Sequence, residues 1–247
     1  RLHLGQIAAD CGQGERARKW FGEIDSEDLR PEADIRSALS LAHEGRIEEA
    51  RALLRNDVED PDLARRYLLA EAQILRDAER PTEALALLEA ALRENPEDTG
   101  LLYEAAMLAE RIDRMDLLEA RLRRVLELQP DHAHALNALG YSLADRGLRL
   151  DEAEALIARA HALMPQDPFI LDSLGWVRFR RGDQVGALVH LERAYGMRKD
   201  AEIAAHLGEV LWTLGRRDEA RRIFAEALAA HPDNRLLTDT GRRLGIQ

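Results

Sequence analysis

The chain has 247 residues, of which 46% are hydrophobic and 33% are charged, and its formal net charge at pH 7 is −11. This acidic excess disfavours binding to nucleic acid or to an anionic membrane surface, and the sequence has no run of about 18 apolar residues that could cross a bilayer. Cys11 is the single cysteine, so neither an intrachain disulfide nor a thiolate metal site is expected.

Small residues recur along the whole chain at intervals of 33 to 35 residues. One position of this pattern, where two helices would approach each other closely, is occupied by Ala17, Ala50, Ala84, Ala153, Ala187 and Ala220, and by the larger Leu118 in the fourth repeat. A second position is occupied by Gly5, Ala38, Ala72, Ala106, Gly140, Gly175 and Gly208. Such a period is typical of stacked helical hairpins, because one hairpin leaves two apolar faces that only its neighbours can cover.

We expect seven such hairpins in chain order, each made of two helices and a tight turn. Pro31 and Pro168 suit the first position of a helix, where the missing N–H is not needed. Pro61 is expected to close the second hairpin, and Asp57 stands where a small residue is usual, which predicts a less regular hairpin there. The expected hairpins are approximately residues 1–30, 31–64, 65–98, 99–132, 133–167, 168–200 and 201–232, followed by a capping helix over 233–245.

The most complete version of the pattern lies between Ala201 and Pro232, in Leu207, Gly208, Leu211, Gly215, Ala220, Phe224, Ala227 and Pro232. It resembles the tetratricopeptide repeat (TPR), a helical hairpin of about 34 residues. The resemblance implies an all-α fold, a TPR solenoid in which about seven hairpins and a capping helix form one right-handed superhelix over residues 1–247. Because the chain begins at Arg1 inside a repeat, we also expect it to be a fragment of a longer protein.

Catalytic signatures are absent from the sequence, which has no phosphate-binding loop, no nucleophile elbow and no paired cysteines. His132 and His134 are two residues apart, and that spacing does not place two imidazoles on one helix face. We therefore expect a protein that is not an enzyme and that holds neither a metal nor a cofactor.

The resemblance implies that the first helix of each hairpin lines a concave groove that binds a partner protein. Trp176 and Trp212 are expected to offer aromatic contact area there, and Asp172 and Glu209 to select a partner segment with Arg, Lys or a free amine. The competing interpretation places both tryptophans in the core after a modest rotation of their helices. Carried over residue by residue, the expected partner-binding groove comprises Asn137, Tyr141, Phe169, Asp172, Trp176, Phe179, Arg180, Glu209 and Trp212.

The same groove positions in the upstream hairpins are mixed in charge and poor in aromatic residues, which predicts a less specific wall or a second contact surface. These positions hold Glu32, Arg36, His43, Arg66, Gln73, Arg76, Tyr103, Glu104, Met107, Glu110 and Arg111.

A narrower resemblance covers residues 131–245, through Leu139-Gly140-Tyr141, the run 167–176 and residues 201–212. These segments resemble the end of TPR lipoproteins of the Gram-negative outer membrane, among which is the adaptor of a periplasmic carboxyl-terminal processing protease. The resemblance implies a non-enzymatic adaptor that binds the protease and its peptidoglycan endopeptidase substrates. It also implies a place on the periplasmic face of the outer membrane, through a lipid anchor upstream of this fragment; otherwise we expect a cytoplasmic protein. Two alternatives stay open, a regulatory or substrate-docking domain of a larger enzyme and a pilus-assembly TPR lipoprotein.

Overall fold

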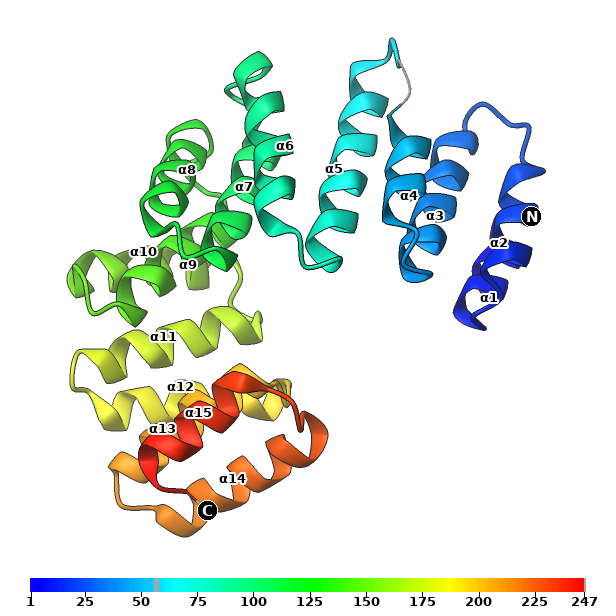
Figure 1. The fold of residues 1–247 in the computed structure, drawn as a ribbon. Helices are drawn as coiled ribbons and strands as arrows, with labels where there is room; N and C mark the ends of the chain where they lie inside the picture. Colours follow the sequence, from blue (N-terminus) through cyan, green and yellow to red (C-terminus); the bar gives the residue numbers. More distant parts are fainter. Residues whose placement is uncertain (56–57, 247) are drawn as a thin grey trace. The chain divides into compact units, whose positions relative to one another are not determined.

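The computed structural model describes residues 1–55 and 58–246, and α-helices are the only regular secondary structure in these ranges. The predicted all-α fold is confirmed. None of the described helices is both long and apolar enough to span a bilayer. Along the described chain (Figure 1) the helices are α1 (Leu2–Asp10), α2 (Gly14–Gly22), α3 (Arg30–His43), α4 (Ile47–Leu54), α5 (Pro61–Asp77), α6 (Pro81–Glu94), α7 (Thr99–Arg111), α8 (Met115–Leu128), α9 (Ala133–Asp145), α10 (Leu150–Leu163), α11 (Pro168–Arg180), α12 (Gln184–Met197), α13 (Ala201–Thr213), α14 (Arg217–Ala230) and α15 (Arg235–Leu244).

Consecutive helices pack as hairpins, for example α1 with α2, α11 with α12 and α13 with α14. The chain divides into two compact units, unit 1 over residues 1–121 and unit 2 over residues 122–247, and α8 contributes to both. We describe each unit by itself, and the organisation of residues 1–247 as one solenoid stays a prediction.

The small residues of the sequence pattern lie where the two helices of a hairpin approach each other. Ala17, Ala50, Ala84, Leu118, Ala153, Ala187 and Ala220 are all 0% exposed. At the facing position, a Cβ added to Gly208 would lie 2.3 Å from the Phe224 ring, and one added to Gly175 would lie 2.6 Å from Leu191. The register read from the sequence is therefore the register of helix contacts within the hairpins.

The helix ends follow from local sequence. Asp98, Asp167 and Asp200 accept hydrogen bonds from the backbone N–H groups that begin α7, α11 and α13, as N-cap residues do. The turn before α14 uses Gly215 in the left-handed region, at φ 79°, where glycine has no steric cost.

The second hairpin differs from the prediction at its end. Pro61 does not close that hairpin; it is the first residue of α5, which begins four residues before the expected boundary at Arg65. The reason is local, because Asp60 caps the helix by accepting a hydrogen bond from the N–H of Asp62 at 2.9 Å, and proline is favoured just after an N-cap. Asp57 lies outside the described residues.

A buried carboxylate joins two hairpins of unit 1. Glu71 on α5 is 4% exposed, and its Oε1 accepts hydrogen bonds from Arg51 Nε at 2.8 Å and from Arg55 Nη2 at 2.6 Å. A buried charge of this kind is tolerated because it is paired and hydrogen-bonded. These bonds hold α4 against α5.

In unit 2, α15 packs on α13 and α14 at the place where a capping helix was predicted. It buries Leu237 and Gly241, and Arg243 donates to both carboxylate oxygens of Glu209 on α13, at 2.8 and 2.6 Å.

We expect Gly208→Leu to lower the free energy of unfolding by about 1–3 kcal/mol, because the new side chain would overlap the Phe224 ring. Urea unfolding followed by circular dichroism measures this change. Gly196→Leu is the matched control, since Gly196 lies in a helix with nothing within 4 Å of an added Cβ. Equal stability of the two variants would contradict the assigned contact.

Candidate functional site

The predicted groove residues of unit 2 come from α9, α11 and α13, and the structure brings several of them together around His206. The Trp176 ring stacks on the His206 ring, with centroids 4.1 Å apart and planes inclined by 18°. The indole Nε1 donates to Asp145 Oδ1 at 3.3 Å. Trp176 is only 6% exposed, so the expectation of an exposed groove tryptophan is wrong for this residue, and the competing interpretation of core packing is the observed one.

Asp172 is also enclosed, at 3% exposure. Its carboxylate oxygens lie 2.9 and 3.1 Å from His206 Nδ1, so its partner is internal. Glu209, at 9% exposure, is likewise taken up by Arg243. The expectation that these two acids select a basic partner segment is therefore wrong as a description of this structure, because both charges are already neutralised inside the unit.

Tyr141 completes this cluster from α9. Its hydroxyl donates to Glu202 Oε1 at 2.5 Å, and its ring lies 5.9 Å from that of His206. Burial, and then the neighbouring Glu202 carboxylate, raise the pKa of Tyr141 well above its ordinary value. Tyr141 therefore acts as a neutral donor at any physiological pH.

His206 has the opposing influences expected of a buried pair. Burial by itself lowers its pKa, but the charge and hydrogen bond of Asp172, with the charges of Glu202 and Asp145, raise the pKa of His206 above 6.5 overall. This role of His206 was not predicted from the sequence. The available signal was its spacing of 34 residues from Asp172, which is one repeat.

The remaining predicted groove residues surround this cluster or lie apart from it. Phe179 is half-buried with its ring 5.4 Å from Trp176, and Arg180 donates to the carbonyl of Asp145. Phe169 is 41% exposed, with the Arg198 guanidinium 5.1 Å from its ring. Asn137 is half-buried, and its Oδ1 is enclosed without a hydrogen-bond partner among the described residues.

Trp212 is half-buried under two cations of α14. The guanidinium carbons of Arg217 and Arg221 lie 5.1 and 5.5 Å from its ring centroid. The structure therefore does not place Trp176 and Trp212 as a pair of open aromatic contacts. A role for either tryptophan in binding a partner stays a prediction.

The described ranges contain no group of three or more His, Cys, Asp or Glu side chains that could hold a metal ion. His132, one of the two neighbouring histidines, is the N-cap of α9, and its Nδ1 accepts from the N–H of Ala135 at 3.1 Å.

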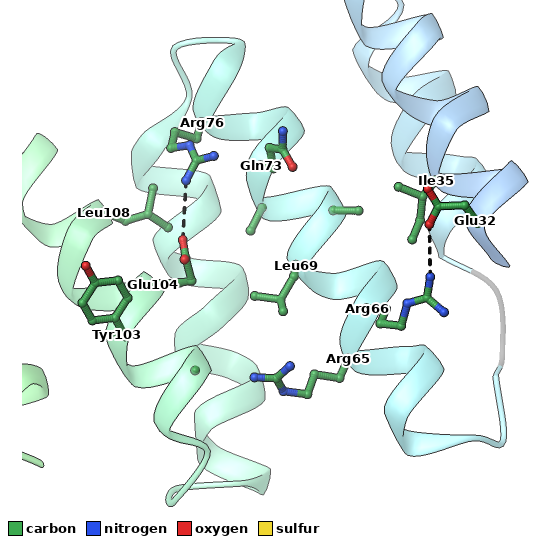
Figure 2. Close-up of a pocket in the computed structure, with 13 residues that line it drawn as sticks. Glu32, Ile35, Arg65, Arg66, Leu69, Gln73, Arg76, Tyr103, Glu104 and Leu108 are labelled. Atoms are coloured by element: carbon green, nitrogen blue, oxygen red, sulfur yellow. Dashed lines mark hydrogen bonds and ion pairs between the residues drawn. The ribbon is translucent and has the colours of Figure 1, made fainter. Parts of the chain in front are cut away.

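An open site lies in unit 1, between α3, α5 and α7, which are the first helices of three successive hairpins (Figure 2). We call it the first-helix pocket. Its volume is about 540 Å³. It is lined by Glu32 and Ile35 of α3, Arg65, Arg66, Leu69, Ala70, Ala72, Gln73 and Arg76 of α5, and Gly100, Tyr103, Glu104 and Leu108 of α7.

Figure 2 shows how α5 divides this pocket: Arg66 extends toward Glu32 on α3, while Arg65 and Leu69 extend toward α7. Arg66 contacts Glu32 at 3.3 Å, and Arg76 contacts Glu104 at 3.5 Å. Both pairs are long and have about a third to a half of each side chain exposed, and such pairs contribute little to stability. These side chains can therefore exchange partners at small cost.

The upstream groove positions predicted from the sequence include six residues that line this pocket. The apolar floor was not among them, since Ile35, Leu69 and Leu108 were not named as groove residues from the sequence. Ile35 and Leu69 are half-buried, and Leu108 is 3% exposed.

Known proteins match this chain over most of its length. Models of the tetratricopeptide repeat match residues 31–56, 69–117, 119–168 and 178–238. A curated protein of Pseudomonas aeruginosa, described as a TPR repeat-containing protein, is 41% identical over 210 residues, which are 84% of this chain and 35% of that protein. The chain thus spans little more than a third of the length of this relative.

Solved structures agree in fold. A tetratricopeptide repeat protein from Parabacteroides merdae is similar with a TM-score of 0.71 and 16% identity, over 98% of this chain and 96% of that chain. YrrB, a TPR protein with an unusual peptide-binding site, is similar with a TM-score of 0.53 and 24% identity, over 70% of this chain and 89% of that chain. At these identities the likeness shows the fold alone.

The two tryptophans should differ in their contribution to stability. We expect Trp176→Ala to lower the free energy of unfolding by about 3–5 kcal/mol, because it empties a buried site and removes the stack on His206. Trp212→Ala should cost about 1–2 kcal/mol, since it removes a half-exposed ring and two cation–π contacts. Thermal and urea unfolding measure both variants, and a larger loss for Trp212→Ala would contradict the assignment.

The His206–Asp172 pair should make stability depend on pH. The pKa of His206 is raised on folding above 6.5, so its contribution is complete below about pH 6.5 and is lost as pH rises through the folded-state pKa. We expect the free energy of unfolding to fall over that range in the wild type and to fall less in His206→Gln. The control is His231→Gln, an exposed histidine of unit 2, which should keep the wild-type slope.

Proposed function

The chain belongs to the tetratricopeptide repeat family, and we propose that it is a non-enzymatic adaptor that binds a segment of a partner protein in the first-helix pocket. TPR repeats suggest a protein–protein interaction scaffold, and the pocket supplies a place for it. The observation that carries the proposal is the contrast between the two units. The first-helix side chains of unit 2 are engaged with one another around His206, whereas those of unit 1 line an open pocket of about 540 Å³.

The chemistry of this pocket suits a peptide. Its aliphatic floor, with Ile35, Leu69 and Leu108, can take an apolar side chain, and the exposed amide of Gln73 can bond to a peptide backbone. Arg66 and Arg76 can turn from their weak internal pairs to carboxylates of the bound segment.

A finer proposal follows from the narrower resemblance of residues 131–245. In it the partner is a periplasmic carboxyl-terminal processing protease, with peptidoglycan endopeptidases as the substrates delivered to it, and the protein stands on the periplasmic face of the outer membrane. What supports it is the resemblance, the TPR fold and the open pocket. Because the chain covers 35% of its P. aeruginosa relative, the activity and location of the whole protein are part of the proposal.

The test is capture of partners from a Gram-negative envelope extract by the wild type and by Arg66→Ala/Gln73→Ala/Arg76→Ala, with identification by mass spectrometry. We expect the wild type to retain a processing protease or a cell-wall hydrolase and the triple variant to retain at least tenfold less. Calorimetry with the purified partner then measures the affinity difference directly.

The matched control is Arg16→Ala/Gln13→Ala/Arg93→Ala, which removes the same side-chain types at exposed positions outside the pocket. It should capture the partner as the wild type does. Equal capture by both triple variants would place binding on another surface, and capture of no envelope protein by the wild type would overturn the adaptor proposal.

A further inference from the structure

We propose that unit 1 has a second docking site, which takes a cationic segment of a partner protein carrying aliphatic side chains. The site is the pocket at one end of the α5–α6 hairpin, between the first turn of α5, the last turn of α6 and the start of α7. We call it the edge pocket. Its volume is about 930 Å³, within the range of pockets that hold ligands of drug or short-peptide size.

The shape of the hairpin creates this pocket. α5 and α6 are joined by a short turn at one end and diverge toward the other (Figure 1). At the open end Leu68 of α5, Ala91 of α6 and Pro96 of the following loop line the pocket, with Leu101 of α7 at its base. Leu101 is 2% exposed, so the apolar floor is continuous with the core of the unit.

The Arg65–Asp98 pair separates the edge pocket from the first-helix pocket. Arg65 lines both pockets, and its Nε and Nη2 donate to the two oxygens of Asp98 at 2.6 and 3.0 Å. Gly100 makes room for the guanidinium, because a Cβ there would lie 2.1 Å from Nη2. The pair neutralises both charges and forms a fixed wall, so the two pockets are distinct sites.

The charge that remains in the edge pocket is negative. Asp62 and Glu94 both line it and are exposed. Arg65, which is hydrogen-bonded to Asp98, also feels the charge of the Asp62 carboxylate. A cation entering between Asp62 and Glu94 would meet two solvent-accessible carboxylates. This complementarity favours Lys or Arg in the occupant, and the aliphatic floor favours Leu, Ile or Val beside it.

Of Asp62 and Glu94, only Asp62 stabilises the helix on which it lies. Asp62 lies in the first turn of α5, where the helix dipole stabilises an acid. Glu94 is the last residue of α6, where the same dipole disfavours a negative charge. Glu94 therefore contributes nothing to the stability of α6, and its carboxylate lines the pocket where a cationic occupant could use it.

The experiment measures binding of fluorescein-labelled hexapeptides to the chain by fluorescence anisotropy at 50 mM and 200 mM NaCl. The probes are Lys-Leu-Lys-Leu-Lys-Leu, Glu-Leu-Glu-Leu-Glu-Leu and Lys-Ser-Lys-Ser-Lys-Ser. We expect the first to bind at least tenfold more tightly than the other two, and more weakly at the higher salt concentration because the carboxylates are exposed. Equal binding of the lysine–serine probe would overturn the proposal, since it would show attraction by net charge alone.

Variants assign the binding to the pocket. Asp62→Asn/Glu94→Gln should weaken the lysine–leucine probe at least fivefold. Glu15→Gln/Asp28→Asn removes the same charges from exposed positions of unit 1 outside the pocket, one of them also in a helix first turn, and should leave affinity unchanged. An equal loss of affinity in both double variants would contradict the assignment of binding to the edge pocket.

The first-helix pocket is tested separately. Arg66→Ala/Gln73→Ala/Arg76→Ala should leave binding of the lysine–leucine probe unchanged, because none of these residues lines the edge pocket. A loss in this variant equal to that in Asp62→Asn/Glu94→Gln would show that one continuous surface is involved and would overturn the proposal of a second site.

Discussion

The structure depends on the close approach of two helices within each hairpin. Where Ala220 and its counterparts are fully enclosed, and where Gly208 leaves room for the Phe224 ring, a larger side chain would separate the helices. This contact recurs at intervals of 33 to 35 residues, so successive hairpins are built alike. Equivalent positions of neighbouring hairpins are thereby brought side by side, although they are far apart in the chain.

Polar pairs at this repeat spacing hold neighbouring hairpins together. Asp172 meets His206 and Glu209 meets Arg243 at a separation of 34 residues, and Arg65 meets Asp98 at 33. Where an acid of such a pair is enclosed, as Asp172 and Glu209 are in unit 2, it must be satisfied by a partner inside the unit, since an unpaired buried charge costs several kcal/mol. The repeat spacing of about 34 residues thus pairs Asp172 with His206 and Glu209 with Arg243. These two acids are therefore not available on the surface of unit 2 to bind a partner.

In unit 1, the ion pairs between the first helices of neighbouring hairpins are less enclosed than the Asp172–His206 pair of unit 2. The Arg66–Glu32 and Arg76–Glu104 pairs are long and only partly enclosed, and the first-helix pocket lies open beside them. The Arg65–Asp98 pair lies between the first-helix pocket, which three arginines line, and the edge pocket, which the exposed acids Asp62 and Glu94 line. The two proposed sites would let the protein position one partner relative to another.

The sequence by itself determined the helical class, the register and the contact residues of the hairpins, because small residues at a fixed period are visible without any structure. It also placed Tyr141, Asp172 and Trp176 on one face. The sequence could not decide whether that face is exposed to solvent. Successive side chains on a helix differ by about 100° in direction, so a rotation of the helix by less than this angle decides whether Trp176 faces solvent or packs on His206. It misplaced Pro61 because a proline that ends one hairpin and a proline that begins the next helix look alike in sequence. Only the tertiary structure, through the packing angles of α5, α6 and α7, decided where a pocket stays open.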